Sequence, residues 1–200
     1  MKPRLAHPAQ KPKRLPPSVW RAPLRRYAIA VGELLWASNR AQASFADLFS
    51  VLVDATKLEI GLAIWLSIQT DKGQITALRA LVATLNSPRT RLHQNIAWAV
   101  AASEKLAEIR NDAAHMATSP TMTIKGIEFI PNPVGNAPTR LKRRSGTDFI
   151  EILSRAKGDY IQVQQYVHDI FCHLAYPNPN YPLPLRPRLL SVVIRSSRKH

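Results

Sequence analysis

Four long segments of this 200-residue chain carry apolar residues at the three-to-four-residue spacing of a helix. The clearest is 148–175, and the others are 26–54, 56–86 and 89–117. The apolar positions of 148–175 are Phe149, Leu153, Ala156, Tyr160, Val163, Val167, Ile170 and Leu174. Because a chain of this length can bury one sizeable core, the pattern predicts an all-α fold, a bundle of four or five helices.

Prolines and a change of pattern limit these segments. Pro88 and Pro120 end the second and third segments, because proline disfavours helix in the residue before it. Gly73, after Asp71 and Lys72, indicates a bend or break within the second segment. Between the third and fourth segments, residues 121–146 include TMTIKGIEFI, which is rich in β-branched residues and alternates, and the loop-like PNPVGNAP. We expect a small β-hairpin or an irregular flap there.

The two ends of the chain concentrate its positive charge and its prolines. Thirteen units of the formal net charge of +15 come from residues 1–26 and 177–200, which hold eight and five basic residues and no acidic ones. Eleven of the sixteen prolines lie in the same two segments, which argues against regular structure there. The sequence therefore predicts a basic, proline-rich N-terminal arm (1–26), a helical domain (27–176) and a proline-rich, basic C-terminal tail (177–200).

Basic tails attract polyanions through counterion release, without choosing a sequence. Two interpretations are open for these tails: contact with nucleic acid, or arms that only aid solubility. The C-terminal tail has two further alternatives. Its P-x-x-P spacings, from Pro179 to Pro182 and from Pro184 to Pro187, are typical of a polyproline ligand, whereas the interleaved apolar and aromatic residues favour an extended strap on the domain.

Cysteine content and hydropathy exclude several protein classes. The single cysteine, Cys172, excludes an internal disulfide and a cysteine-based zinc cluster. The longest apolar run, 58–68, is too short to span a bilayer, and the first residues lack the apolar core of a signal peptide. There is no Gly-rich phosphate loop either. We therefore expect a cytoplasmic protein with no membrane partner, no metal site and no cofactor.

The third segment is otherwise apolar but ends in polar residues, AEIRNDAAHMA over 107–117. At about 100° per residue, Arg110 continues a stripe of buried positions that runs from Leu92 to Leu106. An arginine is costly to bury unless it is paired. We therefore expect Arg110 to face a polar cleft or an acidic residue, while Asp112 points elsewhere, toward solvent or another helix.

Asn111 and His115 lie four residues apart on one flank of this helix, and Glu108 shares that flank. A fixed cation beside a histidine that titrates near neutral pH suits phosphoryl transfer from an RNA 2′-hydroxyl. Histidine transfers the proton, and the fork of Arg110 matches the geometry of the phosphate oxygens. The spacing alone equally fits a structural alternative, in which the histidine caps the helix or lies on its surface.

The hexapeptide R-N-D-A-A-H at 110–115, late in the third helix of the expected bundle, resembles a motif of the HEPN-domain (higher eukaryotes and prokaryotes nucleotide-binding) ribonuclease family. That motif is an arginine followed after four to six residues by histidine, commonly with a polar residue directly after the arginine. Helix count and order extend the resemblance over residues 28–175, although the motif itself covers only six to eight residues. The basic tails have no counterpart in it.

The resemblance implies a homodimer in which two copies of the motif face each other in a composite site. It also implies a metal-independent endoribonuclease that leaves a 2′,3′-cyclic phosphate, with a toxin–antitoxin or phage-defence role and an antitoxin or other protein as a partner. On this basis His115 would transfer a proton, Arg110 would bind the scissile phosphate, and Asn111 would orient one of them. Glu108 is a supporting candidate from the helical pattern alone.

Some HEPN proteins are inactive, so the alternative function is a catalytically inactive HEPN-like dimer that binds nucleic acid or a protein. A second candidate site for RNA lies in the insert, where four of the five residues at 140–144 are basic. These residues are Arg140, Lys142, Arg143 and Arg144. They form either an RNA-binding patch or a solvated loop, and the sequence fits both.

Overall fold

The computed structural model describes residues 17–54, 56–84, 90–115, 118–123, 126–131 and 148–192. Within these ranges the chain forms five helices and one hairpin. The helices are α1 (Pro17–Val53), α2 (Leu58–Ser67), α3 (Asp71–Thr84), α4 (Arg91–His115) and α6 (Phe149–Ala175). The strands β1 (Thr118–Thr123) and β2 (Gly126–Pro131) pair antiparallel, with Thr118 opposite Pro131. The predicted all-α bundle, with a small hairpin between the third and fourth segments, is confirmed.

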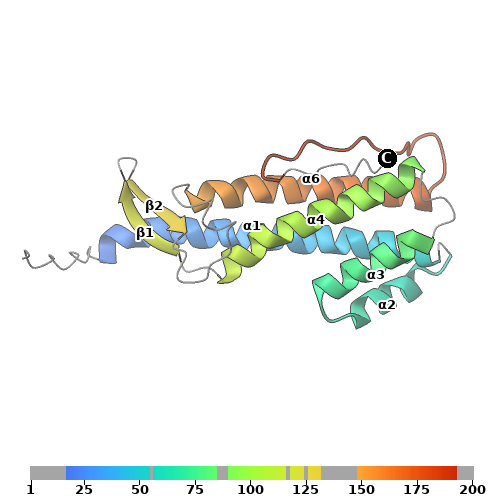
Figure 1. The fold of residues 1–200 in the computed structure, drawn as a ribbon, viewed down its shortest axis with the longest axis horizontal. Coiled ribbons are helices and arrows are strands. Elements are labelled where there is room, and N and C mark those ends of the chain that lie inside the picture. The colour runs from blue at the N-terminus through green and yellow to red at the C-terminus, as the bar shows by residue number, and fades with distance from the viewer. Residues whose placement is uncertain are drawn as a thin grey trace, which may run out of the picture.

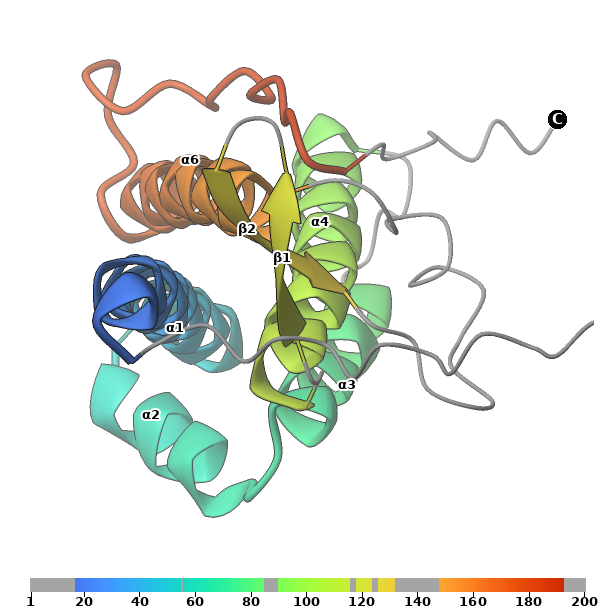
Figure 2. The same ribbon diagram turned by 90° about the vertical axis from the view of Figure 1, so that its left-hand side faces the viewer.

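The long helices α1, α4 and α6 form the body of the bundle. Helices α1 and α6 lie side by side, and α4 crosses them at an angle (Figure 1). Helices α2 and α3 lie at the end of the bundle where α1 finishes, whereas the hairpin lies at the opposite end. Figure 2 looks along the bundle from that hairpin end. None of the described helices combines the length and the apolar character needed to cross a membrane.

The apolar faces of the helices meet in one core. Seven of the eight apolar positions predicted for the last helix are buried, from Phe149 to Ile170, and Leu174 packs against the core partly buried. Burial of one large aliphatic or aromatic side chain contributes about 1.5–3 kcal/mol. Helix α6 begins where expected because the carboxylate of Asp148 accepts a hydrogen bond from the Ile150 N–H (3.2 Å), which caps the first turn.

Helix α1 begins at Pro17, nine residues before the expected start at 26. Proline is tolerated in the first turn of a helix, where its missing N–H has no intrahelical partner anyway. Pro23 lies further inside α1 and removes one helical hydrogen bond. The last part of the predicted N-terminal arm is therefore helical, and residues 1–16 lie outside the described part of the chain.

The expected break in the second segment lies before Gly73, between α2 and α3. Ile68 is extended (φ −86°, ψ 109°) and ends α2. The Gln74 side chain donates hydrogen bonds to the carbonyls of Trp65 and Ile68, both at 3.2 Å, and the Thr70 hydroxyl accepts one from the Gly73 N–H (3.1 Å). Side-chain capping of both helix ends thus stabilises the break, and Gly73 lies inside the first turn of α3.

Gly61 allows α2 to approach α1 closely. A Cβ at this position would lie 2.9 Å from Ser50 Cβ and nearer still to Ser50 Cα. We predict that Gly61→Ala lowers the free energy of unfolding by about 2 kcal/mol through overpacking, as measured by urea unfolding. The matched control is Gly32→Ala, because a Cβ there has no neighbour within 4 Å among the described residues. That change should raise stability by about 0.5 kcal/mol, and equal effects of the two would contradict the prediction.

Residues 176–192 return along α6 and α4 as an extended strap without helix or strand (Figure 1, red). One anchor is the buried Asn95 of α4, which donates to the carbonyl of Pro184 (3.3 Å) and accepts from Nε of Arg186 (3.1 Å). The interpretation of this segment as a strap is confirmed, and its P-x-x-P positions lie within it. Residues 193–200 of the predicted tail lie beyond the described ranges.

A second anchor holds the end of the strap on α6. The fully buried carboxylate of Asp159 accepts hydrogen bonds from the backbone N–H groups of Leu190 (2.8 Å) and Ser191 (2.6 Å) and from the Ser191 hydroxyl. A buried carboxylate is costly unless such donors satisfy it. Asp159 therefore holds the end of the strap on the bundle.

Candidate functional site

The last turns of α4 carry the R-N-D-A-A-H motif. Ile96, Ala99, Ser103 and Leu106 are buried along the predicted stripe, and the Arg110 side chain at its end is 17% exposed. A guanidinium this far out of solvent needs hydrogen-bond partners and an opposite charge. The spacing of α4 therefore dictates a polar environment for Arg110.

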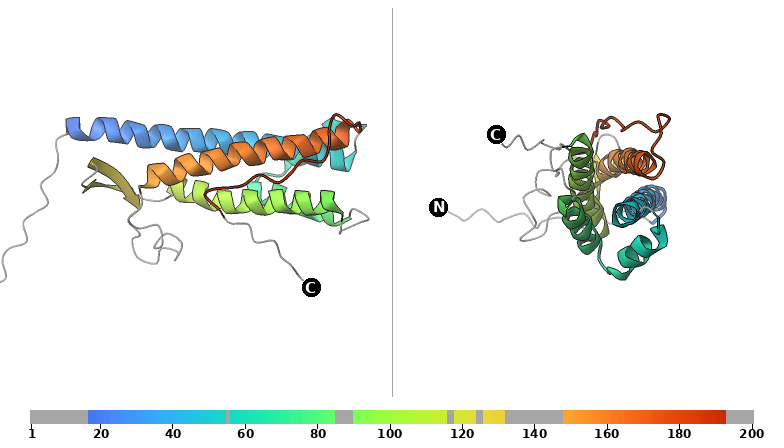
Figure 3. Two further views of the ribbon diagram at one scale, coloured as in Figure 1. Left: turned by 90° about the horizontal axis from the view of Figure 1, so that it is seen from above. Right: turned by 90° about the vertical axis from the view of Figure 1, so that its right-hand side faces the viewer.

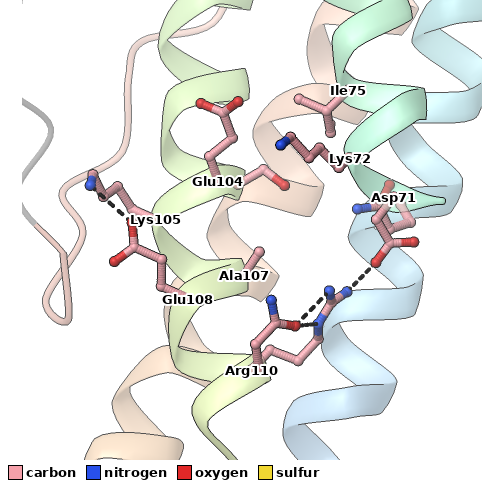
Figure 4. Close-up of a pocket in the computed structure, with 11 residues that line it drawn as sticks. Asp71, Lys72, Ile75, Glu104, Lys105, Ala107, Glu108 and Arg110 are labelled. Carbon is pink, nitrogen blue, oxygen red and sulfur yellow. Dashed lines mark hydrogen bonds and ion pairs between the residues drawn. The ribbon is translucent and has the colours of Figure 1, made fainter. Parts of the chain in front are cut away.

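Arg110 is held by groups from three helices, and Figure 4 shows its contact with Asp71. Its Nη1 forms an ion pair with Asp71 at the start of α3 and donates to the hydroxyl of Ser38 on α1 (3.3 Å). The sequence pattern predicted a polar cleft or an acid beside Arg110 without identifying it. The Nε and Nη2 of Arg110 both donate to Oδ1 of the adjacent Asn111, at 3.4 and 3.1 Å. These bonds fix the plane of the guanidinium.

Tyr160 extends this arrangement to α6. Its side chain is hydrogen-bonded to that of Ser38, and both are buried. Burial raises the pKa of Tyr160 above its usual value, and this outweighs the opposite effects of the Ser38 hydrogen bond and the Arg110 charge. Tyr160 is therefore neutral at physiological pH. We call Arg110, Asp71, Ser38, Asn111 and Tyr160 the Arg110 network.

A surface groove of about 510 Å³ lies beside the Arg110 network, between α1, α3 and α4. This volume is in the range of small-molecule sites. Six charged residues line the groove: Asp71, Lys72, Glu104, Lys105, Glu108 and Arg110. Their formal charges sum to zero, so the groove by itself has no excess of positive charge for a polyanion.

Glu108 lines the same groove but points away from Arg110, toward Lys105 (Figure 4). It forms an ion pair with Lys105 at 3.0 Å, one turn earlier on α4. The two positions are three residues apart and are therefore neighbours on the helix surface, whereas Arg110 lies about 200° around the helix from Glu108. The structure thus places Arg110 and Asn111 together and leaves Glu108 outside the Arg110 network.

The remaining residues predicted from the sequence are either buried or outside the described part of the chain. Asp112 is 4% exposed, which excludes the solvent-facing alternative and favours the other predicted one, in which it faces another helix. His115 is the last residue of α4, and its side chain lies outside the described part of the structure. The candidate basic patch, Arg140, Lys142, Arg143 and Arg144, also lies outside the described ranges.

Sequence reasoning missed Asp71 and Ser38 as partners of Arg110, and Tyr160 as the partner of Ser38. Asp71 and Ser38 are 39 and 72 residues away from Arg110 along the chain. The pattern on α4 shows that a polar cleft or an acid is needed, but the choice of acid depends on which helix end packs beside it. The available signal for the partner of Arg110 was the position of Asp71, an acidic residue directly before Lys72-Gly73, where the sequence predicts a bend.

The network determines what Arg110 can do chemically. Its contacts with the described residues use four of the five guanidinium N–H donors. The Nη1 side is held by Asp71 and Ser38, whereas the Nε/Nη2 edge faces the exposed Asn111. That edge is the planar fork that recognises two oxygens of a phosphate. An acceptor that displaces the Asn111 amide would gain a bidentate contact.

Among the described residues, no group of three or more His, Cys, Asp or Glu side chains is arranged to hold a metal ion. Comparisons with known proteins give no further guidance. No protein-family model, no curated protein and no solved structure matches this chain.

Proposed function

We propose that this protein is a metal-independent endoribonuclease of HEPN type that acts in the cytoplasm. The observation that carries the proposal is the state of Arg110 in the R-N-D-A-A-H motif. Its Nη1 side is fixed by Asp71 and Ser38, while its phosphate-matching Nε/Nη2 edge is covered by exposed Asn111. A preorganised cation of this kind stabilises negative charge that develops on a phosphate.

In the proposed reaction, the 2′-hydroxyl of RNA attacks the neighbouring phosphorus. His115 of one copy takes the 2′-hydroxyl proton, and His115 of the second copy gives a proton to the departing 5′-oxygen. The bond from the 2′-oxygen to phosphorus forms and the bond to the 5′-oxygen breaks. The products are a 2′,3′-cyclic phosphate and a 5′-hydroxyl, while Arg110 stabilises the phosphate oxygens and Asn111 orients the phosphate or the histidine.

A homodimer is part of this proposal, because one motif contains one histidine and the reaction needs two proton transfers. Support comes from apolar side chains that are exposed on the surface, since such patches commonly mark protein contacts. Four of them lie on α2, in two pairs on either side of its buried face: Ile60 with Ile64, and Leu62 with Leu66. A toxin or phage-defence role, with an antitoxin or other protein as a partner, belongs to the same proposal.

The test is cleavage of RNA by the purified protein in excess EDTA. We expect cleavage by the wild type, and a loss of at least about 100-fold in His115→Ala and in Arg110→Ala, because each removes a group that acts on the transition state. Arg155→Ala is the matched arginine control, because Arg155 pairs with Glu151 on the surface of α6. Cleavage that survives both motif substitutions, or that requires a metal in the wild type, would overturn the mechanism.

A second candidate is a catalytically inactive dimer that binds nucleic acid or protein. The observation that favours it is the Arg110 network itself, because Arg110 links α1, α3 and α4 and so has a structural task. This alternative predicts salt-sensitive RNA binding without any product, and binding that His115→Ala leaves unchanged.

A further inference from the structure

The first turns of α1 extend past the beginning of α6. The ring of Tyr27 stacks on that of Phe149, the first residue of α6, with 6.5 Å between the ring centroids. Residues 17–26 therefore lie beyond the first turn of α6, and Figure 3 shows this part of α1 reaching past the neighbouring helix. At 1.5 Å per residue, these ten residues extend over roughly 15 Å. We call residues 17–26 the basic projection.

Three exposed arginines dominate the basic projection: Arg21, Arg25 and Arg26. None of them forms an ion pair within the described part of the chain, and the sequence contains no acidic residue before Glu33. Several cations elsewhere on the bundle are paired with acidic residues. Lys157 pairs with Glu33 at 3.0 Å, Arg79 with Glu104 and Arg155 with Glu151. Among the described residues, no acidic side chain neutralises the positive charge of the projection.

The exposed apolar residues of this region do not form a face that suits a membrane. Val19, Leu24 and Ile29 are exposed, and successive members of this series are five residues apart. At about 100° per residue they are separated by about 140° around the helix, so they point in three directions. A helix that lies in a lipid surface needs one continuous apolar face. The shared feature of the projection is therefore its charge, which suits a phosphate backbone.

The projection and the motif lie at the same end of the molecule. The motif ends α4 at His115, and β1 begins three residues later at Thr118. Figure 1 shows the end of α4, the hairpin and the first half of α1 together at one end of the bundle. The groove beside Arg110 has balanced charges, so an RNA strand at the motif needs its electrostatic attraction from elsewhere.

We propose that the basic projection binds the sugar–phosphate backbone of RNA through Arg21, Arg25 and Arg26, and leads the strand toward the motif at the end of α4. The identity of the bound strand rests on the proposed ribonuclease function. The contacts are to phosphates, so they confer affinity without sequence preference.

The experiment measures binding of a fluorescently labelled 2′-O-methyl RNA, which cannot be cleaved by 2′-hydroxyl attack, at a series of salt concentrations. The triple variant Arg21→Ala/Arg25→Ala/Arg26→Ala should reduce the slope of log K against log salt by about 2, since each single-strand phosphate contact contributes about 0.7. The affinity near 0.1 M salt should fall roughly 10- to 100-fold. Folding is preserved because alanine favours helix, which circular dichroism checks.

The matched control, Arg79→Ala/Arg155→Ala/Lys157→Ala, also removes three positive charges, but at positions where each cation is ion-paired. Its slope should equal that of the wild type. Equal slopes for the two triple variants would overturn the proposal, and so would binding of phosphatidylserine vesicles in place of RNA. Because the probe is not cleaved, binding and cleavage are tested separately. A reduced slope in a protein without nuclease activity would contradict the ribonuclease proposal but support RNA binding by the basic projection. Cleavage by the wild type together with an unchanged slope would support the ribonuclease and contradict RNA binding by the projection.

Discussion

Asp159→Ala is expected to lower the free energy of unfolding by about 3 kcal/mol and to release the C-terminal strap. The Asp159 carboxylate is fully buried and accepts hydrogen bonds from the backbone of Leu190 and Ser191 and from the Ser191 hydroxyl. A hydrogen bond to a charged group contributes about 1.5–3 kcal/mol, and its loss leaves the donors without a partner.

Urea unfolding and limited proteolysis check this prediction, since a released strap should be cut by proteases before the bundle is. Asp169→Ala is the matched control on the same helix. The Asp169 carboxylate accepts a hydrogen bond from the exposed side chain of Gln165 (2.8 Å), so its replacement should change stability by less than about 0.5 kcal/mol. Similar losses in the two variants, or a strap that stays protected in Asp159→Ala, would show that the anchor is not where we place it.

Arg110→Ala is expected to reduce kcat/KM for RNA by at least about 100-fold and to lower stability by about 1–2 kcal/mol. The activity falls because the fork that binds phosphate is lost. Stability falls because Asp71 and Ser38 lose the partner that links their helices. The Asp71 side chain is 47% exposed, so water compensates for part of this loss and the ion pair contributes modestly.

Arg110→Lys separates the two tasks of this residue. Lysine keeps the charge beside Asp71 but lacks the planar fork with two parallel donors. We therefore expect the lysine variant to have a melting temperature between those of the alanine variant and the wild type. Most of its activity on RNA should nevertheless be lost. A lysine variant as active as the wild type would show that the Nε/Nη2 edge does not bind phosphate.

The helices were predictable because amphipathic spacing is a local property. The seven predicted stripe positions from Phe149 to Ile170 are all buried in the bundle. The hairpin was predictable for a similar reason, because β-branched alternation followed by a proline-rich loop occurs within a few residues. Helix boundaries were less predictable. Eleven of the sixteen prolines lie in the two end segments, which argued against a helix there, yet α1 starts at Pro17 because a proline fits the first turn of a helix.

The candidate site was predictable only in part. The stripe on α4 indicates that Arg110 needs a polar cleft or an acid, but Asp71 becomes that acid only when α3 packs beside α4. The helical spacing placed Glu108 on the flank of Asn111, yet in the structure Glu108 pairs with Lys105. The buried anchors of the strap, Asn95 and Asp159, had no signal in the helical pattern, because their partners lie in a segment without periodicity. The catalytic roles of Arg110, Asn111 and His115 stay predictions.

The chemistry of the product ends tests the central claim most directly. The wild-type protein is incubated with a defined RNA in excess EDTA, and the fragments are identified by mass spectrometry. Attack by the 2′-hydroxyl predicts fragments that end in a 2′,3′-cyclic phosphate and begin with a 5′-hydroxyl, and no fragments from the 2′-O-methyl form of the same RNA. Intact RNA, or fragments with a 3′-hydroxyl and a 5′-phosphate, would contradict the account.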